Sequence, residues 1–287
     1  MGLNYDALMN HEFEELVQTY TTADTALYAL GVGLGHDPLD EAQLRFVYEE
    51  NMLALPTMAT VLAGHGFWLK ESWTGVDWVR VLHGEQGLRL HGVLPAAATV
   101  KARMRVTEIV DKGPDKGAFI HCERELRDET TGDLLCTLTA TVVARGDGGF
   151  GGPSRRSKPV HAPPDRDPDA VCDLPTLSQA ALIYRLSGDF NPLHAVPSVA
   201  REAGFEVPIL HGLCTLGVAG HAVLKTWCGY DPARFKSLDL RFSAPAYPGE
   251  TIRTEMWRDD GVVSFRARAI ERDVVVLDNG RAEVAES

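Results

Sequence analysis

An approximate internal repeat constrains the fold of this chain more than any other feature of its sequence. The triplet Ala63-Gly64-His65 recurs as Ala219-Gly220-His221, and Tyr28 recurs as Tyr184, both at an offset of 156 residues (219 − 63; 184 − 28). A shared order of segments accompanies these anchors, because each half runs from apolar helical text into strand-like text. We therefore predict a duplicated α+β unit.

The order of segments can be followed along both halves. The helical segments are residues 22–35 and 55–69 in the first half, and 177–188 and 209–227 in the second. The strand-like segments are residues 88–95, 99–110, 118–128 and 134–145, and then 235–247, 250–259, 262–272 and 273–284. Glycine, basic residues and proline crowd residues 145–169, a composition typical of a linker. We predict an N-terminal unit over 1–145, a linker over 146–168 and a C-terminal unit over 169–287.

Composition narrows the class of protein. With 45% hydrophobic and 24% charged residues, the 287-residue chain has the make-up of a globular protein. Its net charge of −12 argues against a nucleic-acid partner. The five cysteines include no CxxC pair, so we expect reduced thiols and no zinc site. No apolar run approaches the ~20 residues that span a bilayer, and neither terminus carries a targeting signal, so we expect a cytoplasmic protein.

The stretch YRLSGDFNPLH, residues 184–194, carries the strongest chemical signal. Pro192 disfavours a helix at Asn191, which makes this stretch a turn that can point Asp189 and His194 to one side. A carboxylate and an imidazole that share a water molecule can move a proton. The alternative interpretation is an ordinary turn with a capping Asx side chain.

Gly212 begins the second helical segment of the second half. Free N–H groups and the helix dipole favour negative charge at such a position, and glycine lets a ligand carbonyl come close. This predicts an oxyanion hole for a developing enolate. In the first half Pro56 stands at the equivalent place and has no N–H to donate. Only the second half is therefore equipped for this chemistry.

Around these residues the sequence resembles a known family. YRLSGDFNPLHAVPSVAREAGFEVPILHG looks like the hydratase 2 motif of the MaoC-like dehydratases, the (R)-specific 2-enoyl-CoA hydratases. First-half segments such as LYALGVG, LPTMATVL, LHGEQ and DKGPDKGAF, and RFSAPAYPGE in the second half, are similar to the hydratase 2 unit of peroxisomal multifunctional enzyme type 2. The resemblance covers nearly the whole chain.

The resemblance implies a double hot-dog fold, in which each unit wraps a long helix in a curved antiparallel sheet. The first unit would be non-catalytic and would accommodate the acyl chain, with small residues such as Ala59 and Ala63 leaving room. The implied catalytic set is Asp189, His194, Asn191 and Gly212. The implied substrate contacts are His83, Gly84, Lys112, Phe190, Pro192, Leu193 and Phe242. A hairpin turn at His83-Gly84, a solvated Lys112 and a core Phe242 are the structural alternatives.

The implied reaction is the reversible hydration of trans-2-enoyl-CoA to (3R)-3-hydroxyacyl-CoA. It needs no metal or other cofactor, because CoA is part of the substrate. Two alternatives stay open: dehydration of 3-hydroxyacyl groups on acyl carrier protein, and a non-catalytic acyl-CoA-binding module. The sequence also leaves open the acyl chain type, the physiological direction and the oligomeric state, with a homodimer as one option.

Overall fold

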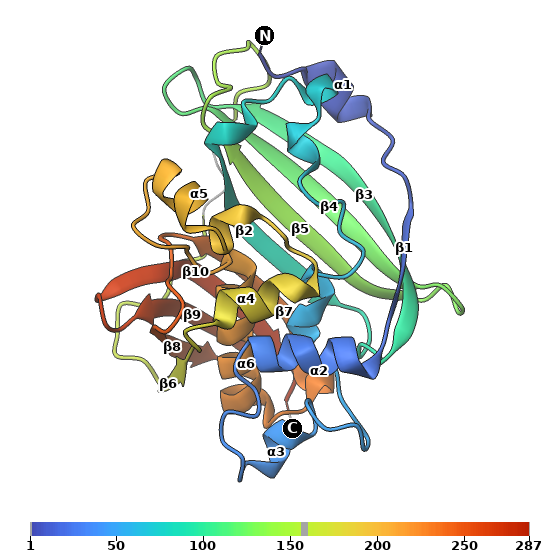
Figure 1. Ribbon diagram of the computed structural model, residues 1–287, viewed down its shortest axis with the longest axis vertical. Helices are drawn as coiled ribbons and strands as arrows, with labels where there is room; N and C mark the ends of the chain where they lie inside the picture. The colour runs from blue at the N-terminus through green and yellow to red at the C-terminus, as the bar shows by residue number, and fades with distance from the viewer. Residues whose placement is uncertain (1, 156–159, 287) are drawn as a thin grey trace.

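A single antiparallel sheet of ten strands organises the computed structural model, which describes residues 2–155 and 160–286 (Figure 1). The strands are β1 (Leu16–Tyr20), β2 (Val81–Leu90), β3 (Ala98–Asp111), β4 (Ala118–Asp128), β5 (Leu134–Ala144), β6 (Ala170–Pro175), β7 (Phe235–Phe242), β8 (Thr251–Asp259), β9 (Val262–Ala269) and β10 (Val274–Val284). Their order in the sheet is β1-β3-β4-β5-β2-β7-β10-β9-β8-β6. From each edge inward the connectivity is the same, so the two halves are copies that join where β2 pairs with β7. The predicted double hot-dog fold is confirmed.

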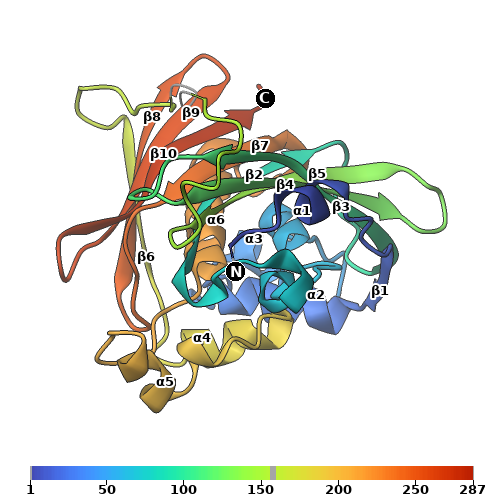
Figure 2. The same ribbon diagram turned by 90° about the horizontal axis from the view of Figure 1, so that it is seen from above.

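The helices lie on the concave side of this sheet. The α-helices are α1 (Tyr5–Asn10), α2 (Thr22–Gly31), α3 (Glu41–Leu44), α4 (Ala180–Tyr184), α5 (Pro197–Glu202) and α6 (Gly212–Cys228). The 3₁₀ helices are η1 (Pro56–Thr60), η2 (Trp68–Lys70), η3 (Ser72–Thr74), η4 (Trp78–Arg80), η5 (Arg185–Ser187), η6 (Pro192–His194) and η7 (Pro232–Arg234). Figure 2 shows the sheet arching over α6, with α2 and α4 beyond it.

Helix α6 is the long central helix that the second half was predicted to contain. It is apolar around most of its circumference, which suits a helix packed between the sheet and the first half. Two glycines allow this close packing. A Cβ at Gly217 would lie 2.6 Å from a methyl of Val32, and one at Gly220 would lie 2.5 Å from a methyl of Thr57. The helix ends at Gly229, whose left-handed conformation suits glycine.

The helix predicted over residues 55–69 is wrong beyond Thr60. In its place the structure has the short helix η1, followed by turns and η2. Ala63 adopts a left-handed φ of 46°, and its N–H donates to the side chain of Gln18 at 2.6 Å. Arg124 donates to the carbonyl of Thr60 at 2.8 Å. Side chains from the distant strands β1 and β4 therefore form hydrogen bonds with backbone groups that would otherwise have been paired within a longer helix.

Several strand predictions also need correction. The first strand predicted in the first half, residues 88–95, is β2, which begins seven residues earlier at Val81 and ends at Leu90. The edge strands β1 and β6 were not predicted at all. Both are short, and neither segment shows a clear alternation of apolar and polar residues. Their pairing with β3 and β8 makes them strands.

The repeat is visible at the centre of the core. Tyr28 and Tyr184, which occupy the same place in the two halves, are both fully buried with ring centroids 5.9 Å apart. All five cysteines are buried and free, as expected from their spacing. None of the helices formed by the described residues has the length and apolar character needed to cross a bilayer.

The described part of the predicted linker, residues 146–155 and 160–168, contains no helix or strand. It is nevertheless held in place. The Asp111 carboxylate accepts the N–H groups of Gly149 at 2.7 Å and Gly151 at 2.9 Å, and His161 bonds to the Ser264 hydroxyl at 2.8 Å. Residues 156–159 of the linker lie outside the described residues, and the unit boundaries stay a prediction.

Candidate active site

The loop between α4 and α5 folds as two consecutive Asx turns. Gly188 has a φ of 120°, which favours glycine, and reverses the chain after η5. One Asp189 carboxylate oxygen then accepts the Asn191 N–H at 3.1 Å. The Asn191 side chain in turn accepts the Leu193 N–H at 3.1 Å and caps η6, which carries His194. The two turns themselves therefore follow from the local sequence.

This loop brings the predicted acid–base pair together. A carboxylate oxygen of Asp189 and a ring nitrogen of His194 lie within 4.8 Å of each other, close enough to share one water molecule. His194 is 9% exposed, and its Nδ1 lies 2.9 Å from the carbonyl oxygen of Ile209. A carbonyl can only accept, so Nδ1 carries the proton and Nε2 of the neutral ring is left as an acceptor. Burial lowers the pKa of His194, which favours this neutral form.

His211 is a site residue that sequence reasoning missed. Its ring stacks on that of His194, with centroids 3.8 Å apart and planes inclined by 28°. Its Nε2 donates to the main-chain carbonyl of Asp189 at 3.2 Å. Burial first, and then the neighbouring His194, lower the pKa of His211 to about 4. Its position directly before Gly212 was the one available signal in the sequence.

Gly212 is the first residue of α6, as predicted. Among the hydrogen bonds of the described residues, none uses its N–H, which is expected for the first turn of a helix. The 17-residue helix adds the positive end of its dipole. A Cβ at this position would lie 3.0 Å from the Phe242 ring, so glycine also permits close packing there. The free N–H and the dipole together suit an oxyanion.

His83, Gly84 and Phe242 come from β2 and β7, the strands that join the halves. The His83 and Phe242 rings are 4.8 Å apart, and Phe242 also packs against Gly212. His83-Gly84 is not a hairpin turn, since both residues lie within β2 at a bulge. A Cβ at Gly84 would lie 2.8 Å from a methyl of Val143. The structure thus places His83 and Phe242 beside the start of α6.

Three of the remaining predicted contacts lie in the loop itself, and the fourth, Lys112, lies in the first half. Phe190 is 59% exposed, with the Arg185 guanidinium 5.0 Å above its ring, while Pro192 and Leu193 form η6. Lys112 follows β3, three strands from β2 and about 14 Å away at the usual strand spacing. Its ammonium group lies 5.1 Å from the Phe119 ring centroid. The binding roles of these four residues stay predictions.

Asp189, His194 and His211 offer ligand atoms close enough for a metal ion, but the ring geometry does not suit one. A metal ion lies about 2 Å from a ligating nitrogen, near the plane of its ring. Two rings stacked 3.8 Å apart with an inclination of 28° cannot aim lone pairs at one such point.

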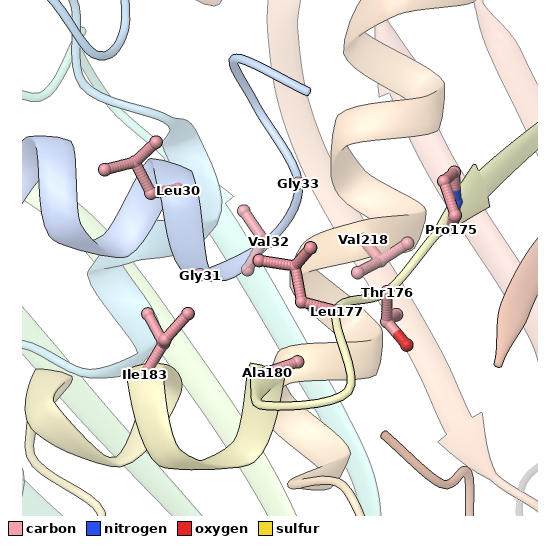
Figure 3. A pocket seen from close by; sticks show the side chains of 10 residues that line it. All are labelled: Leu30, Gly31, Val32, Gly33, Pro175, Thr176, Leu177, Ala180, Ile183 and Val218. Carbon is pink, nitrogen blue, oxygen red and sulfur yellow. The ribbon is translucent and has the colours of Figure 1, made fainter. Parts of the chain in front are cut away.

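A small cavity elsewhere belongs to the packing of the two halves. It measures about 10 Å³, room for about one water molecule, and lies among α2, α4 and α6 (Figure 3). Its lining is formed by Leu30, Gly31, Val32, Gly33, Pro175, Thr176, Leu177, Ala180, Ile183 and Val218. None of these side chains titrates, so the cavity has no acid–base chemistry.

Comparisons with known proteins found similarity along nearly the whole chain. The MFE-2 hydratase 2 N-terminal domain model matches residues 18–146, and the MaoC-like domain model matches residues 159–279. The chain is 38% identical to the peroxisomal enoyl-CoA hydratase 2 of Arabidopsis thaliana over 96% of this chain and 93% of the relative. It is 42% identical to 3-hydroxyacyl-thioester dehydratase Y of Mycobacterium tuberculosis over 94% of each chain. The crystal structure of a MaoC-like dehydratase from Phytophthora capsici superposes with a TM-score of 0.86, at 33% identity, over 99% of this chain and all of that one.

Proposed function

Because this chain belongs to the enoyl-CoA hydratase 2 family of MaoC-like proteins, we propose that it catalyses the reversible hydration of trans-2-enoyl-CoA to (3R)-3-hydroxyacyl-CoA. It is a hydro-lyase whose substrate is an acyl-CoA. The main structural support for this chemistry is the arrangement of three groups. The Asp189 carboxylate and the His194 ring lie within 4.8 Å of each other, beside a helix that begins with a free N–H at Gly212.

The two bases act on a single water molecule. Neutral His194 accepts one hydrogen of this water at Nε2 and orients it, while the Asp189 carboxylate takes the other proton. The water oxygen bonds to C3 of the enoyl group, and the Asp189 carboxyl then delivers its proton to C2. Hydrogen and hydroxyl are therefore added from the same side of the double bond, and the carboxylate is regenerated.

Charge develops on the thioester oxygen while the new C3–O bond forms. The Gly212 N–H and the dipole of α6 stabilise this enolate oxygen. The N–H is part of the folded backbone, so it needs no reorganisation when the charge appears. Phe242 lies beside Gly212, which is itself exposed and therefore open to the substrate.

The reaction can be followed directly with crotonyl-CoA. Loss of the conjugated enoyl absorbance on mixing, together with (3R) configuration of the product, is the expected result. Tight binding of crotonyl-CoA without any change in absorbance would instead support a non-catalytic binding module.

Dehydration of 3-hydroxyacyl thioesters is the second candidate function. The similarity to 3-hydroxyacyl-thioester dehydratase Y favours it, and it is the same reaction in reverse. A comparison of CoA and acyl-carrier-protein thioesters, in both directions, distinguishes the two candidates.

The acidic side of the pH profile depends on His194. Protonation removes the Nε2 lone pair that accepts from water, so hydration is lost as the pH falls through the pKa of this ring. Burial lowers this pKa from the ordinary 6.5, so the neutral form persists to lower pH. We expect the acidic limb of kcat/KM for crotonyl-CoA to lie below pH 6.5. A limb at or above that value, or the same limb in the residual activity of His194→Gln, would contradict this assignment.

We also propose that the first half accommodates the acyl chain. One support is the short helix η1, which ends at Thr60, whereas the equivalent helix of the second half, α6, continues to Cys228. The other is the small size of the side chains of Ala59 and Ala63. Ala63→Phe is expected to lower kcat/KM for a long-chain trans-2-enoyl-CoA by about 10-fold or more relative to crotonyl-CoA. Crotonyl-CoA is the internal control for folding. Equal losses on both substrates would indicate a folding defect, whereas an unchanged kcat/KM for the long-chain substrate would exclude an acyl-chain role for this position.

A further inference from the structure

His211 lies at the junction of the three groups that the proposed reaction uses. Its ring packs face to face on His194 at 3.8 Å, its Nε2 holds the main chain of Asp189 at 3.2 Å, and the next residue is Gly212. The ring is only 1% exposed. On another side it meets Tyr184, with centroids 5.1 Å apart. His211 therefore touches both bases without needing to touch the substrate.

The hydrogen bonds of His211 and His194 show which ring nitrogen of each carries a proton. The carbonyl of Asp189 can only accept, so Nε2 of His211 carries a proton, and burial favours the neutral ring in which this is its one N–H. Two residues earlier, the carbonyl of Ile209 fixes the tautomer of His194. The segment 209–212 thus sets the proton on one imidazole, supports its face, holds the main chain of the carboxylate and supplies the free amide.

We propose that His211 is a positioning residue for the hydration reaction, a flat uncharged support that fixes the ring plane of His194 and the backbone of Asp189 so that both bases meet one water molecule. This inference rests on the proposed hydratase function. A loop anchored at one end by an exposed turn would otherwise leave the two bases free to separate. Small displacements of this kind are costly, because proton transfer requires the reacting atoms to be within hydrogen-bonding distance.

Burial favours the neutral form of His211, while the neighbouring Asp189 carboxylate acts in the opposite direction. The titratable or charged groups that act on it are His194 on η6, Asp189 in the loop and Arg185 on η5. Burial is the main reason that its pKa is lowered to about 4, and His194 adds to the effect. His194 in turn is shielded from water on the face that His211 covers.

Two substitutions separate the roles of the ring and of its N–H group. His211→Gln keeps a donor near the Nε2 position but removes the flat ring, whereas His211→Phe keeps a flat ring but removes the donor. We expect kcat for crotonyl-CoA to fall by up to about 10²-fold in His211→Gln and by about 10-fold in His211→Phe, with KM within about 3-fold of wild type. In His211→Gln the acidic limb of kcat/KM should also move to higher pH, because water reaches the uncovered face of His194.

Several outcomes would overturn the inference. Wild-type kcat in both variants would do so, and so would a loss confined to KM or an acidic limb that does not move in His211→Gln. Affinity for a saturated acyl-CoA, which binds but cannot react, shows whether the site is intact. If His211→Gln proves unfolded, kcat of His211→Phe decides, since phenylalanine fills the buried volume. A wild-type protein that leaves crotonyl-CoA unchanged would instead refute the proposed function itself.

Discussion

Asp189→Asn lowers the rate of crotonyl-CoA hydration by about 10²- to 10⁴-fold, the usual contribution of a positioned acid–base group. The amide has the size of the carboxylate, and its oxygen can still accept the Asn191 N–H that now bonds to Asp189 at 3.1 Å. The turn is therefore kept while the proton acceptor is lost. The measurement is the decrease in enoyl absorbance at saturating crotonyl-CoA, and a loss in kcat rather than KM is expected.

Asp231→Asn is a matched control for this substitution. Like the Asp189 carboxylate, that of Asp231 accepts an N–H two residues ahead, from Ala233 at 2.9 Å, and it caps η7. This second Asx turn lies after α6, at the opposite end of that helix from Gly212. We expect wild-type activity in Asp231→Asn. Comparable activity in both variants would mean that Asp189 does no more than shape its turn.

Gly212→Pro is expected to reduce kcat by about 10²- to 10³-fold relative to Gly212→Ala, the cost of removing one oxyanion donor. Proline is well suited to the first position of a helix, and the extended ψ of 134° at His211 suits a residue before proline. The first half illustrates the point, since Pro56 begins η1 at the equivalent position. The substitution therefore removes the N–H and keeps the helix.

The alanine variant isolates the effect of the donor. Both substitutions add a Cβ, which would lie 3.0 Å from the Phe242 ring, so crowding against Phe242 is common to both. Only proline also deletes the N–H. The two variants are compared by kcat for crotonyl-CoA and by melting temperature. Equal kcat values would show that the oxyanion is stabilised elsewhere.

The repeat and the catalytic turn could be predicted because both depend on neighbours in the chain. Apolar periodicity and turn residues indicated the paired units and helix α6, while Pro192 indicated the turn that holds Asp189 and His194. The two Asx turns that shape this loop are local, whereas the contacts of Ile209 and His211 with its two bases come from outside it. The reduced cysteines followed from their spacing.

The features that could not be predicted depend on contacts between distant parts of the chain. The edge strands β1 and β6 are strands because β3 and β8 pair with them. Likewise His83 was identified only through the family resemblance, and its contact with Phe242 exists because β2 pairs with β7 across the two halves. The pattern of residues within a segment does not show which distant strand that segment will pair with.

Taken alone, the amino-acid sequence determined that two similar α+β units exist and that one of them carries a carboxylate and an imidazole in one bend. Tertiary structure alone decided that the first unit breaks its long helix, because Gln18 and Arg124 take up backbone groups around Ala63 and Thr60. It also decided that His211 stacks on His194, because the start of α6 packs against the loop that carries His194. Hydrogen bonds between near neighbours can be foreseen from the order of residues, whereas contacts across the fold appear only after the chain has closed on itself.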